Sequence, residues 1–228
     1  MAWDTDATRE KLLDAAIAEF SERGFAGARI HQISLASGCN RERIYFYYGG
    51  KAQLFEAALG RQLVTALEDL PVVGSGPEAV ADFAGRYFDF STSFPSLARL
   101  TFWEGLERSD PIDAERRALL AADKAAEIRR ALPAISEAAA EDLLLTIVTL
   151  CHAWVAVPNV RAVITPTADG VRRRTSIMRT VELLSRDVER AWDHLATDEP
   201  CLLGYAQGLT GQWPTRPDAS ARAERLPG

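Results

Sequence analysis

Residues 28–55 read ARIHQISLASGCNRERIYFYYGGKAQLF, and they indicate the structure of the N-terminal part of the chain. Apolar residues over 30–37 are spaced as on one face of a short helix. Gly38 can adopt the positive φ that a tight turn requires, and Asn40 is a favoured N-cap for a second helix over 41–47. The sequence therefore predicts two short helices joined by a glycine turn.

The second of these helices is dense in cations and aromatic rings. Within seven residues it carries two arginines and three aromatic side chains, at Arg41, Arg43, Tyr45, Phe46 and Tyr47. Such a surface is suited to an anionic, polar partner. A helix, a glycine turn and a basic-aromatic helix are together typical of the helix-turn-helix motif, whose second helix enters the major groove of DNA.

The run IYFYYGGK at 44–51, followed by Leu54 and Phe55, resembles a specific family signature. In the TetR (tetracycline-repressor) family the third helix typically ends Leu-Tyr-x-Tyr-Phe, and a lysine follows after two further residues. The resemblance extends over about residues 8–58, because the upstream helix also has the family's apolar side and C-terminal glycine, at Ile17, Phe20, Gly24 and Phe25. Among the departures of this chain from the family pattern, Tyr48 replaces the usual Phe, Arg29 stands where Thr or Ser is usual, and Ser34 stands where Ala is usual.

The resemblance implies an all-α fold, with an N-terminal three-helix helix-turn-helix DNA-binding domain and a C-terminal helical domain for ligand binding and dimerisation. It also implies a transcriptional regulator, most often a repressor, that binds operator DNA as a homodimer. A small-molecule effector would release it. Because one recognition helix has a small footprint, we expect two copies on a palindromic operator.

Composition agrees with a soluble globular protein of one or two domains, at 228 residues with 47% apolar and 25% charged side chains. The net charge is −6, yet residues 28–55 carry four basic side chains against Glu42 alone. A basic module on an acidic body directs phosphate contacts to one face.

Three cysteines, Cys39, Cys151 and Cys201, match no zinc or redox spacing, which favours a reducing cytoplasm and no metal or cofactor. The N-terminus has no apolar signal core. The longest apolar run, 143–157, is shorter than a membrane span and is read as a buried helix.

Helical spacing recurs along the chain, and no stretch alternates convincingly at period two. We predict a helix-turn-helix domain at 1–50, a connecting helix at 51–70, an effector-binding and dimerisation domain at 71–196, and a poorly ordered tail at 197–228. Further helices are expected at 6–23, 77–93, 95–108, 113–132, 141–157 and 171–196, with an irregular connection at 158–170.

Phosphate contacts are expected from Tyr45 and Tyr47, which lie on different flanks of their helix, and from Lys51, where the ammonium and the helix N-terminus can meet phosphate together. The resemblance implies the same roles. The alternative is that the tyrosines cap the small domain and Lys51 is only solvated. Arg29 offers a further phosphate partner, and Asn40 lies at the same interface.

Base contacts are expected from the first turn of the helix at 41–47. Arg41 and Arg43 can bind guanine, Glu42 can accept from cytosine, and Phe46 can touch a thymine methyl group. Two alternatives stay open. Glu42 lies in the first turn, where an acidic side chain stabilises the helix through its dipole without any contact to DNA. Arg41 is equally suited to bind a phosphate.

The C-terminal part contains aromatic and titratable side chains on three helices, which we interpret as candidates for an effector pocket: Phe83, Tyr87, Phe90, Phe102, Trp103, His152 and Trp154. The pocket would take a largely apolar molecule. Ordinary core packing is the alternative for each, and His152 is the leading candidate because it is polar within the most apolar helix.

The last helix has an apolar stripe that predicts a dimer interface, formed by Ile177, Val181, Leu184 and Val188. The same helix opens with Arg172, Arg173 and Arg174, which are either a partner-facing cluster or a solvated face. The sequence disfavours two other classes of protein. An enzyme is disfavoured because Cys151 and His152 are adjacent and cannot face each other on a helix, and an interaction adaptor is disfavoured by the intact set of Tyr45, Tyr47 and Lys51.

Overall fold

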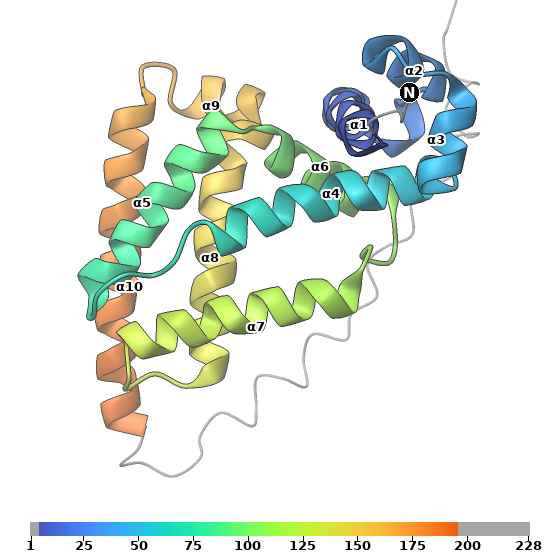
Figure 1. The fold of residues 1–228 in the computed structure, drawn as a ribbon. Coiled ribbons are helices and arrows are strands. Elements are labelled where there is room, and N and C mark those ends of the chain that lie inside the picture. Colours follow the sequence, from blue (N-terminus) through green and yellow to red (C-terminus); the bar gives the residue numbers. More distant parts are fainter. Residues whose placement is uncertain (1–4, 196–228) are drawn as a thin grey trace, which may run out of the picture. The chain divides into compact units, whose positions relative to one another are not determined.

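The N-terminal helices pack around a small apolar core, as the sequence predicts. They are α1 (Thr5–Gly27), α2 (Ile30–Ser37) and α3 (Arg41–Tyr48) (Figure 1). The computed structural model describes residues 5–195. The core contains Phe20 and Phe55, whose rings meet edge to face with centroids 5.0 Å apart, together with the fully buried Ile33 and Ile44.

The turn between α2 and α3 has the predicted geometry. Gly38 has φ 67°, in the left-handed region, and its amide donates to carbonyls of the last turn of α2. The Asn40 side chain accepts a hydrogen bond from the Arg43 amide at 3.2 Å and so caps α3. Arg29, at the corresponding position before α2, makes no side-chain cap.

A long helix, α4 (Lys51–Glu68), leads to the remaining described helices (Figure 1). These are α5 (Pro77–Ser93), α6 (Ser96–Glu107), α7 (Ala114–Ala131), α8 (Glu137–Ala156), α9 (Pro158–Ile164) and α10 (Gly170–Leu195). The described part of the chain contains no strand, and its residues through 193 pack as one unit. The tail predicted at 197–228 lies outside the described residues.

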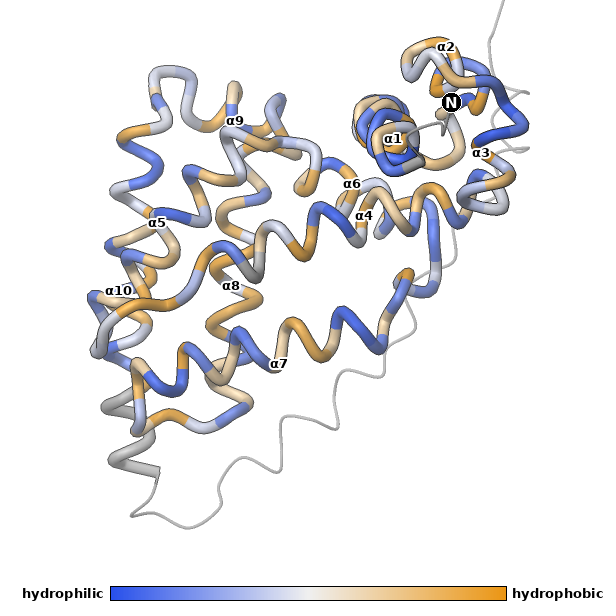
Figure 2. The backbone as a smooth tube through the Cα atoms, viewed as in Figure 1, coloured by the Kyte–Doolittle hydropathy of each residue, from blue (hydrophilic) through white to orange (hydrophobic). Residues whose placement is uncertain are grey.

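Helix α8 forms the centre of the C-terminal helices and packs against α5, α6, α7 and α9. It is long and apolar enough to cross a membrane by length and composition alone. Its inward residues, from Ala140 to His152, are nevertheless buried against neighbouring helices, as in a core helix. Figure 2 shows its apolar character beside the mixed polarity of α7.

Two differences from the predicted helices lie at the start of α8 and in the segment that follows it. Helix α8 starts at Glu137, four residues early, because the Ser136 hydroxyl accepts from the Ala139 amide at 3.1 Å and caps it. The connection predicted as irregular contains α9, which has Pro158 in its first turn, where the missing amide hydrogen costs nothing.

The connection between α4 and α5 is held in place by two side chains of α7. Buried Lys124 donates from Nζ to the Leu70 carbonyl at 2.9 Å and to Glu127 Oε2 at 2.8 Å. The same Glu127 oxygen accepts from the Val72 amide. The C-terminal end of α4 is therefore fixed to α7.

Candidate nucleic-acid interface and ligand cavity

Helix α3 turns one apolar side chain inward and most of its chemistry outward. Ile44 is fully buried, whereas Tyr45 is 55% exposed and Phe46 is 82% exposed. Arg41 and Glu42, one turn earlier, are exposed on the same side because residues four apart share a face. An aromatic ring this exposed has little of its own chain to pack against, so this face is available to a partner.

The flanks of α3 hold the other predicted residues. Arg43 and Tyr47 are half-buried, one turn apart, and the Tyr47 ring packs edge to face on Phe46 at 5.2 Å. Tyr48 lies on the inner side and its hydroxyl donates to the Arg9 carbonyl at 3.0 Å. Partial burial raises the Tyr48 pKa, which agrees with a structural role for this side chain.

Lys51 begins α4 beside the end of α1. Its ammonium donates to the Ala26 carbonyl at 3.3 Å and lies 5.0 Å from the centre of the Phe25 ring. No carboxylate of the described residues pairs with it. The structure thus places a partly exposed cation at a helix N-terminus, an arrangement that favours phosphate.

The other two predicted DNA contacts lie at the N-terminal ends of their helices. Arg29 is exposed, and its backbone amide donates to Glu19 Oε1 at 3.0 Å. Asn40 is exposed, but its side-chain oxygen is engaged in capping α3. Its amide nitrogen is the group left for a partner.

A contact between α1 and α6 was not anticipated from the sequence. Gly24 has φ 70° and breaks the helical path of α1, which frees the next amides. Glu107, the last residue of α6, accepts from the Phe25 amide at 2.6 Å and the Ala26 amide at 3.1 Å. A Cβ atom on Gly24 would lie 2.7 Å from Glu107 and 2.8 Å from the Trp103 ring. Only glycine permits this close approach.

The larger of two notable cavities, with a volume of about 610 Å³, lies among α4 to α8. Tyr87 and His152, two of the seven residues that the sequence suggested for an effector pocket, line this cavity. Much of its wall comes from α7, where the sequence predicts no pocket residue. The small side chains of α7 leave the space, and they include Ala114, Ala118, Ala121 and Ala122.

Tyr87 and His152 form a buried polar pair in this wall. A hydrogen bond joins Tyr87 Oη and His152 Nε2 at 2.9 Å, and the rings stack with centroids 5.6 Å apart. Burial lowers the pKa of His152 to about 4 and raises the pKa of Tyr87, so both groups are neutral near pH 7.

The cavity also contains one arginine whose charge is already compensated. Arg117 Nη1 donates to both carboxylate oxygens of buried Glu104, at 2.8 and 2.7 Å, and to the Ile112 carbonyl. The remaining wall is largely apolar, with Leu63, Leu144 and Val148, and has one further charged side chain, Glu141. This arrangement suits a mainly apolar, uncharged molecule.

The other residues predicted for the pocket lie elsewhere. Phe83 is buried in the core with Lys124 above its ring, and Phe90 packs on Phe94. Phe102 is half-buried and Trp103 packs against Gly24, both outside the cavity wall. Trp154 lines a different, smaller pocket. The spacing of these aromatic residues reflects helix packing, which sequence alone does not separate from a cavity wall.

The apolar stripe of α10 divides between the chain's own core and its surface. Ile177 and Val181 are 1% and 0% exposed, so this chain already covers them. Val188 is half-buried, while Leu184 is 38% and Leu183 is 57% exposed. A partner could therefore cover Leu183 and Leu184, but Ile177 and Val181 cannot form such a surface.

Sequence comparisons place the chain among known regulators. Residues 12–58 match the model described as "Bacterial regulatory proteins, tetR family", and residues 79–182 match "Tetracyclin repressor-like, C-terminal domain". The chain is 34% identical over 175 residues to the HTH-type transcriptional repressor SCO4008 of Streptomyces coelicolor, which covers 74% of this chain and 89% of that protein. It is 27% identical to the HTH-type transcriptional repressor NicS of Pseudomonas putida, over 69% of this chain and 76% of that one.

A solved structure agrees. The transcriptional regulator SCO4942 from Streptomyces coelicolor superposes with a TM-score of 0.64 at 26% identity, over 78% of this chain and 97% of that chain. A helix-turn-helix with an outward basic-aromatic helix, a helical body with a cavity, and these relatives lead to one conclusion. The chain belongs to the TetR family of bacterial transcriptional regulators, and it is not an enzyme.

Proposed function

We propose that this protein is a cytoplasmic repressor that binds a palindromic operator as a homodimer and releases it when a small molecule occupies the central cavity. The outward face of α3 is the observation that carries the DNA-binding part. It presents Arg41, Glu42, Tyr45 and the 82% exposed Phe46 together, beside Lys51. The names of SCO4008 and NicS, both repressors, support the sign of regulation.

In this proposal phosphate contacts supply affinity and α3 supplies specificity. Tyr45, Tyr47, Lys51 and Arg29 contact phosphate, while the first turn of α3 reads base edges. The Lys51 ammonium also lies 5.0 Å from the centre of the Phe25 ring, so the test should keep the length of the side chain while removing its charge.

The test is selection of operator DNA by the purified protein, followed by binding of three variants at several salt concentrations. Lys51→Met keeps the alkyl chain and should weaken all sites alike, lowering the salt slope by about one unit. Arg43→Ala should instead change the preferred bases, at a cost of about 1–3 kcal/mol on the correct site. Arg130→Met, an exposed cation on α7, is the matched control and should change neither. Reversed effects of the first two variants would overturn the assignment.

The homodimer is supported by exposed apolar side chains on the two longest helices of the body. Leu145 on α8 is 65% exposed and also lines the central cavity, and the neighbouring Leu183 and Leu184 lie exposed on α10. Adjacent exposed apolar side chains such as Leu183 and Leu184 are suited to an interaction site. Two α3 helices in the dimer should then lie about 34–36 Å apart, so that they enter successive major grooves.

The effector is expected to be largely apolar and uncharged, with a group that hydrogen-bonds to Tyr87 or His152. A charged ligand is disfavoured because Glu104 already neutralises Arg117. A ligand changes DNA binding only through different affinity for the DNA-competent and DNA-incompetent forms. A tenfold release of DNA needs a difference of about 1.4 kcal/mol, which one buried hydrogen bond with some apolar contact supplies.

The route from cavity to DNA has two parts in this proposal. Helix α4 connects the two regions covalently and is fixed by Lys124 at its C-terminal end. The second route is α6, which contributes Thr101 to the cavity and ends at Glu107 on the Phe25 and Ala26 amides. Ala26 also accepts from Lys51, so movement of α6 reaches a proposed phosphate contact directly.

A cavity-filling variant tests the effector site. Ala121→Trp would occupy space beside α8 without removing a polar partner. Once an effector is identified by thermal-shift screening, this variant should bind operator normally and respond weakly to effector. Leu119→Trp, a change on the same helix at a 68% exposed position outside the cavity wall, should respond as the unmodified protein does. Equal responses of both variants would place the effector elsewhere.

A further inference from the structure

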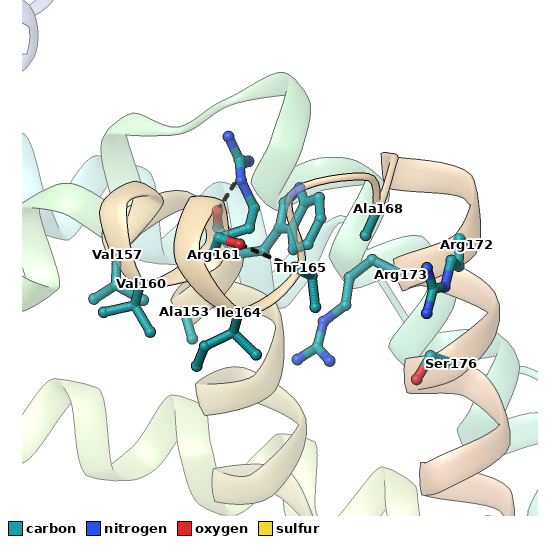
Figure 3. Close-up of a pocket in the computed structure, with 11 residues that line it drawn as sticks. Ala153, Val157, Val160, Arg161, Ile164, Thr165, Ala168, Arg172, Arg173 and Ser176 are labelled. Carbon is teal, nitrogen blue, oxygen red and sulfur yellow. Dashed lines mark hydrogen bonds between the residues drawn. The ribbon is translucent and has the colours of Figure 1, made fainter.

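A second pocket, separate from the central cavity, lies between the end of α8, α9 and the start of α10 (Figure 3). Its volume is about 250 Å³. Its apolar wall comes from α8 and α9 and includes Ala153, Val157, Val160 and Ile164. No residue lines both this pocket and the central cavity, so occupancy of the two can be tested independently.

Three arginines line the small pocket: Arg161, Arg172 and Arg173. None of them forms an ion pair with a carboxylate of the described residues. Other arginines of the body are paired, as Arg174 is with Asp89 and Arg117 with Glu104. The pocket therefore combines apolar walls with three arginines that form no ion pair with a carboxylate of the described residues.

Arg173 is the arginine aimed into the pocket. Figure 3 shows its side chain reaching from α10 toward Ile164, whereas the Arg161 guanidinium points away from the valines. Arg161 instead stacks on the Trp154 ring at 4.6 Å and donates to the Trp154 carbonyl at 3.3 Å. Stacking on the Trp154 ring stabilises the charge of Arg161. Arg173 has no such aromatic partner within the described part of the chain, so we expect an anion in the pocket to pair with Arg173.

The hydrogen bonds of Arg173 are incomplete. A guanidinium has five N–H donors, and the single partner that Arg173 has among the described residues is the Leu150 carbonyl, 3.3 Å from Nη2. Its Nε is buried with no partner. A buried donor without an acceptor is unfavourable, and a carboxylate is the acceptor that fits a guanidinium best because it can take two parallel hydrogen bonds.

We propose that this pocket binds a small organic carboxylate with a compact apolar body, its carboxylate paired with Arg173 and its apolar part against Val157, Val160 and Ile164. The volume limits the size of the ligand. A cavity of about 150 Å³ holds benzene, so about 250 Å³ holds one ring with a carboxylate. The central cavity, with its compensated Arg117, selects against the same molecule.

The test uses the full chain and three probes of this size: benzoate, 4-methylbenzoate and cyclohexanecarboxylate. Binding is followed by ligand-observed NMR, with benzamide as the uncharged counterpart of benzoate. At least one carboxylate should bind with a dissociation constant below about 10 mM, and benzamide should bind at least tenfold more weakly than benzoate. Failure of all three acids, or equal binding of benzoate and benzamide, would overturn the proposal.

Variants locate the bound acid. Arg173→Met should weaken binding at least tenfold, Arg173→Lys should restore part of it, and Arg179→Met, an exposed arginine of the same helix outside the pocket, should have no effect. Ala168→Phe fills the pocket from the α9–α10 connection and should block binding even if Arg173→Met alters local folding. Loss of binding in Ala121→Trp, with retention in Arg173→Met and Ala168→Phe, would place the acid in the central cavity and contradict the proposal.

Discussion

At the scale of single residues, two side chains in the wall of the central cavity, Tyr87 and His152, have strongly shifted pKa values. His152 is 3% exposed, and its ring is bonded to Tyr87. Burial lowers its pKa to about 4, against an ordinary value of 6.5. The unfolded chain therefore binds a proton at a higher pH than the folded chain does.

His152→Gln should make the free energy of unfolding less dependent on pH below about pH 6.5. In the unmodified protein the histidine lowers the free energy of unfolding as pH falls from about 6.5 to about 4, by up to about 3 kcal/mol. It has no such effect above pH 6.5, where it is neutral in both states. Glutamine cannot titrate but can still hydrogen-bond to Tyr87. Urea unfolding at several pH values measures the difference.

His31→Gln is the control for that experiment, because His31 is exposed on α2. This substitution should leave the pH profile unchanged. If His152→Gln and the unmodified protein lost stability in parallel below pH 6.5, His152 would not be the group responsible.

At the scale of elements, the contact between α1 and α6 depends on one glycine. Gly24→Ala should destabilise the protein by several kcal/mol, because the methyl group would meet Glu107 and Trp103 and the φ of 70° strains any other residue. Gly60→Ala is the matched change. Gly60 lies within α4 with no atom near its would-be Cβ, so alanine should stabilise by up to about 1 kcal/mol. Thermal unfolding of both variants gives the comparison.

Glu107→Gln tests the carboxylate of the same contact. Amide hydrogen bonds to a charged acceptor contribute about 1.5–3 kcal/mol, and glutamine keeps the size but loses the charge. Operator affinity should also change, because the Phe25 and Ala26 amides lie next to Lys51. Glu56→Gln, an exposed position on α4, serves for comparison. An unchanged melting temperature in Glu107→Gln would show that the contact is not stabilising.

The elements that sequence predicted well are those set by local chemistry. Gly38 and Asn40 determine the turn within a few residues, and both act as expected. Glu107 could not be predicted because its partners lie more than 80 residues earlier in the chain. The same holds for α7, whose small alanines form a cavity wall only together with four other helices, α4, α5, α6 and α8. The aromatic residues Phe83 and Trp103 show the opposite case. The sequence suggested both for the pocket, but they pack outside the cavity wall.

At the scale of the whole molecule, the domain division at 1–50, 51–70 and 71–196 stays a prediction, since residues 5–193 pack as one unit. The proposed dimer depends on side chains that a single chain leaves uncovered. Within α10 the buried Val181 and the exposed Leu183 are two residues apart and have opposite roles. A substitution that tests the dimer interface must therefore be made at an exposed residue of α10, because a change at a buried apolar residue would disrupt the core.

Leu183→Arg should give a folded monomer, because it places a charge in the proposed interface without entering the core. Val181→Arg should instead unfold the chain, since it would bury an unpaired charge. Val73→Arg, at a 65% exposed position outside the interface, should remain dimeric. Light scattering with circular dichroism separates these outcomes. A Leu183→Arg variant that stays dimeric would exclude this part of α10 from the interface.

The uneven distribution of charge along this chain should affect the speed of DNA binding. Four basic side chains lie between residues 28 and 55, while the chain as a whole has a net charge of −6. A duplex is therefore repelled by most of the surface and attracted by one part of it. Encounters should be oriented before contact, and the association rate constant should fall steeply with ionic strength. The same repulsion shortens the time spent on DNA in unproductive orientations, so the search for an operator is faster than affinity alone would indicate.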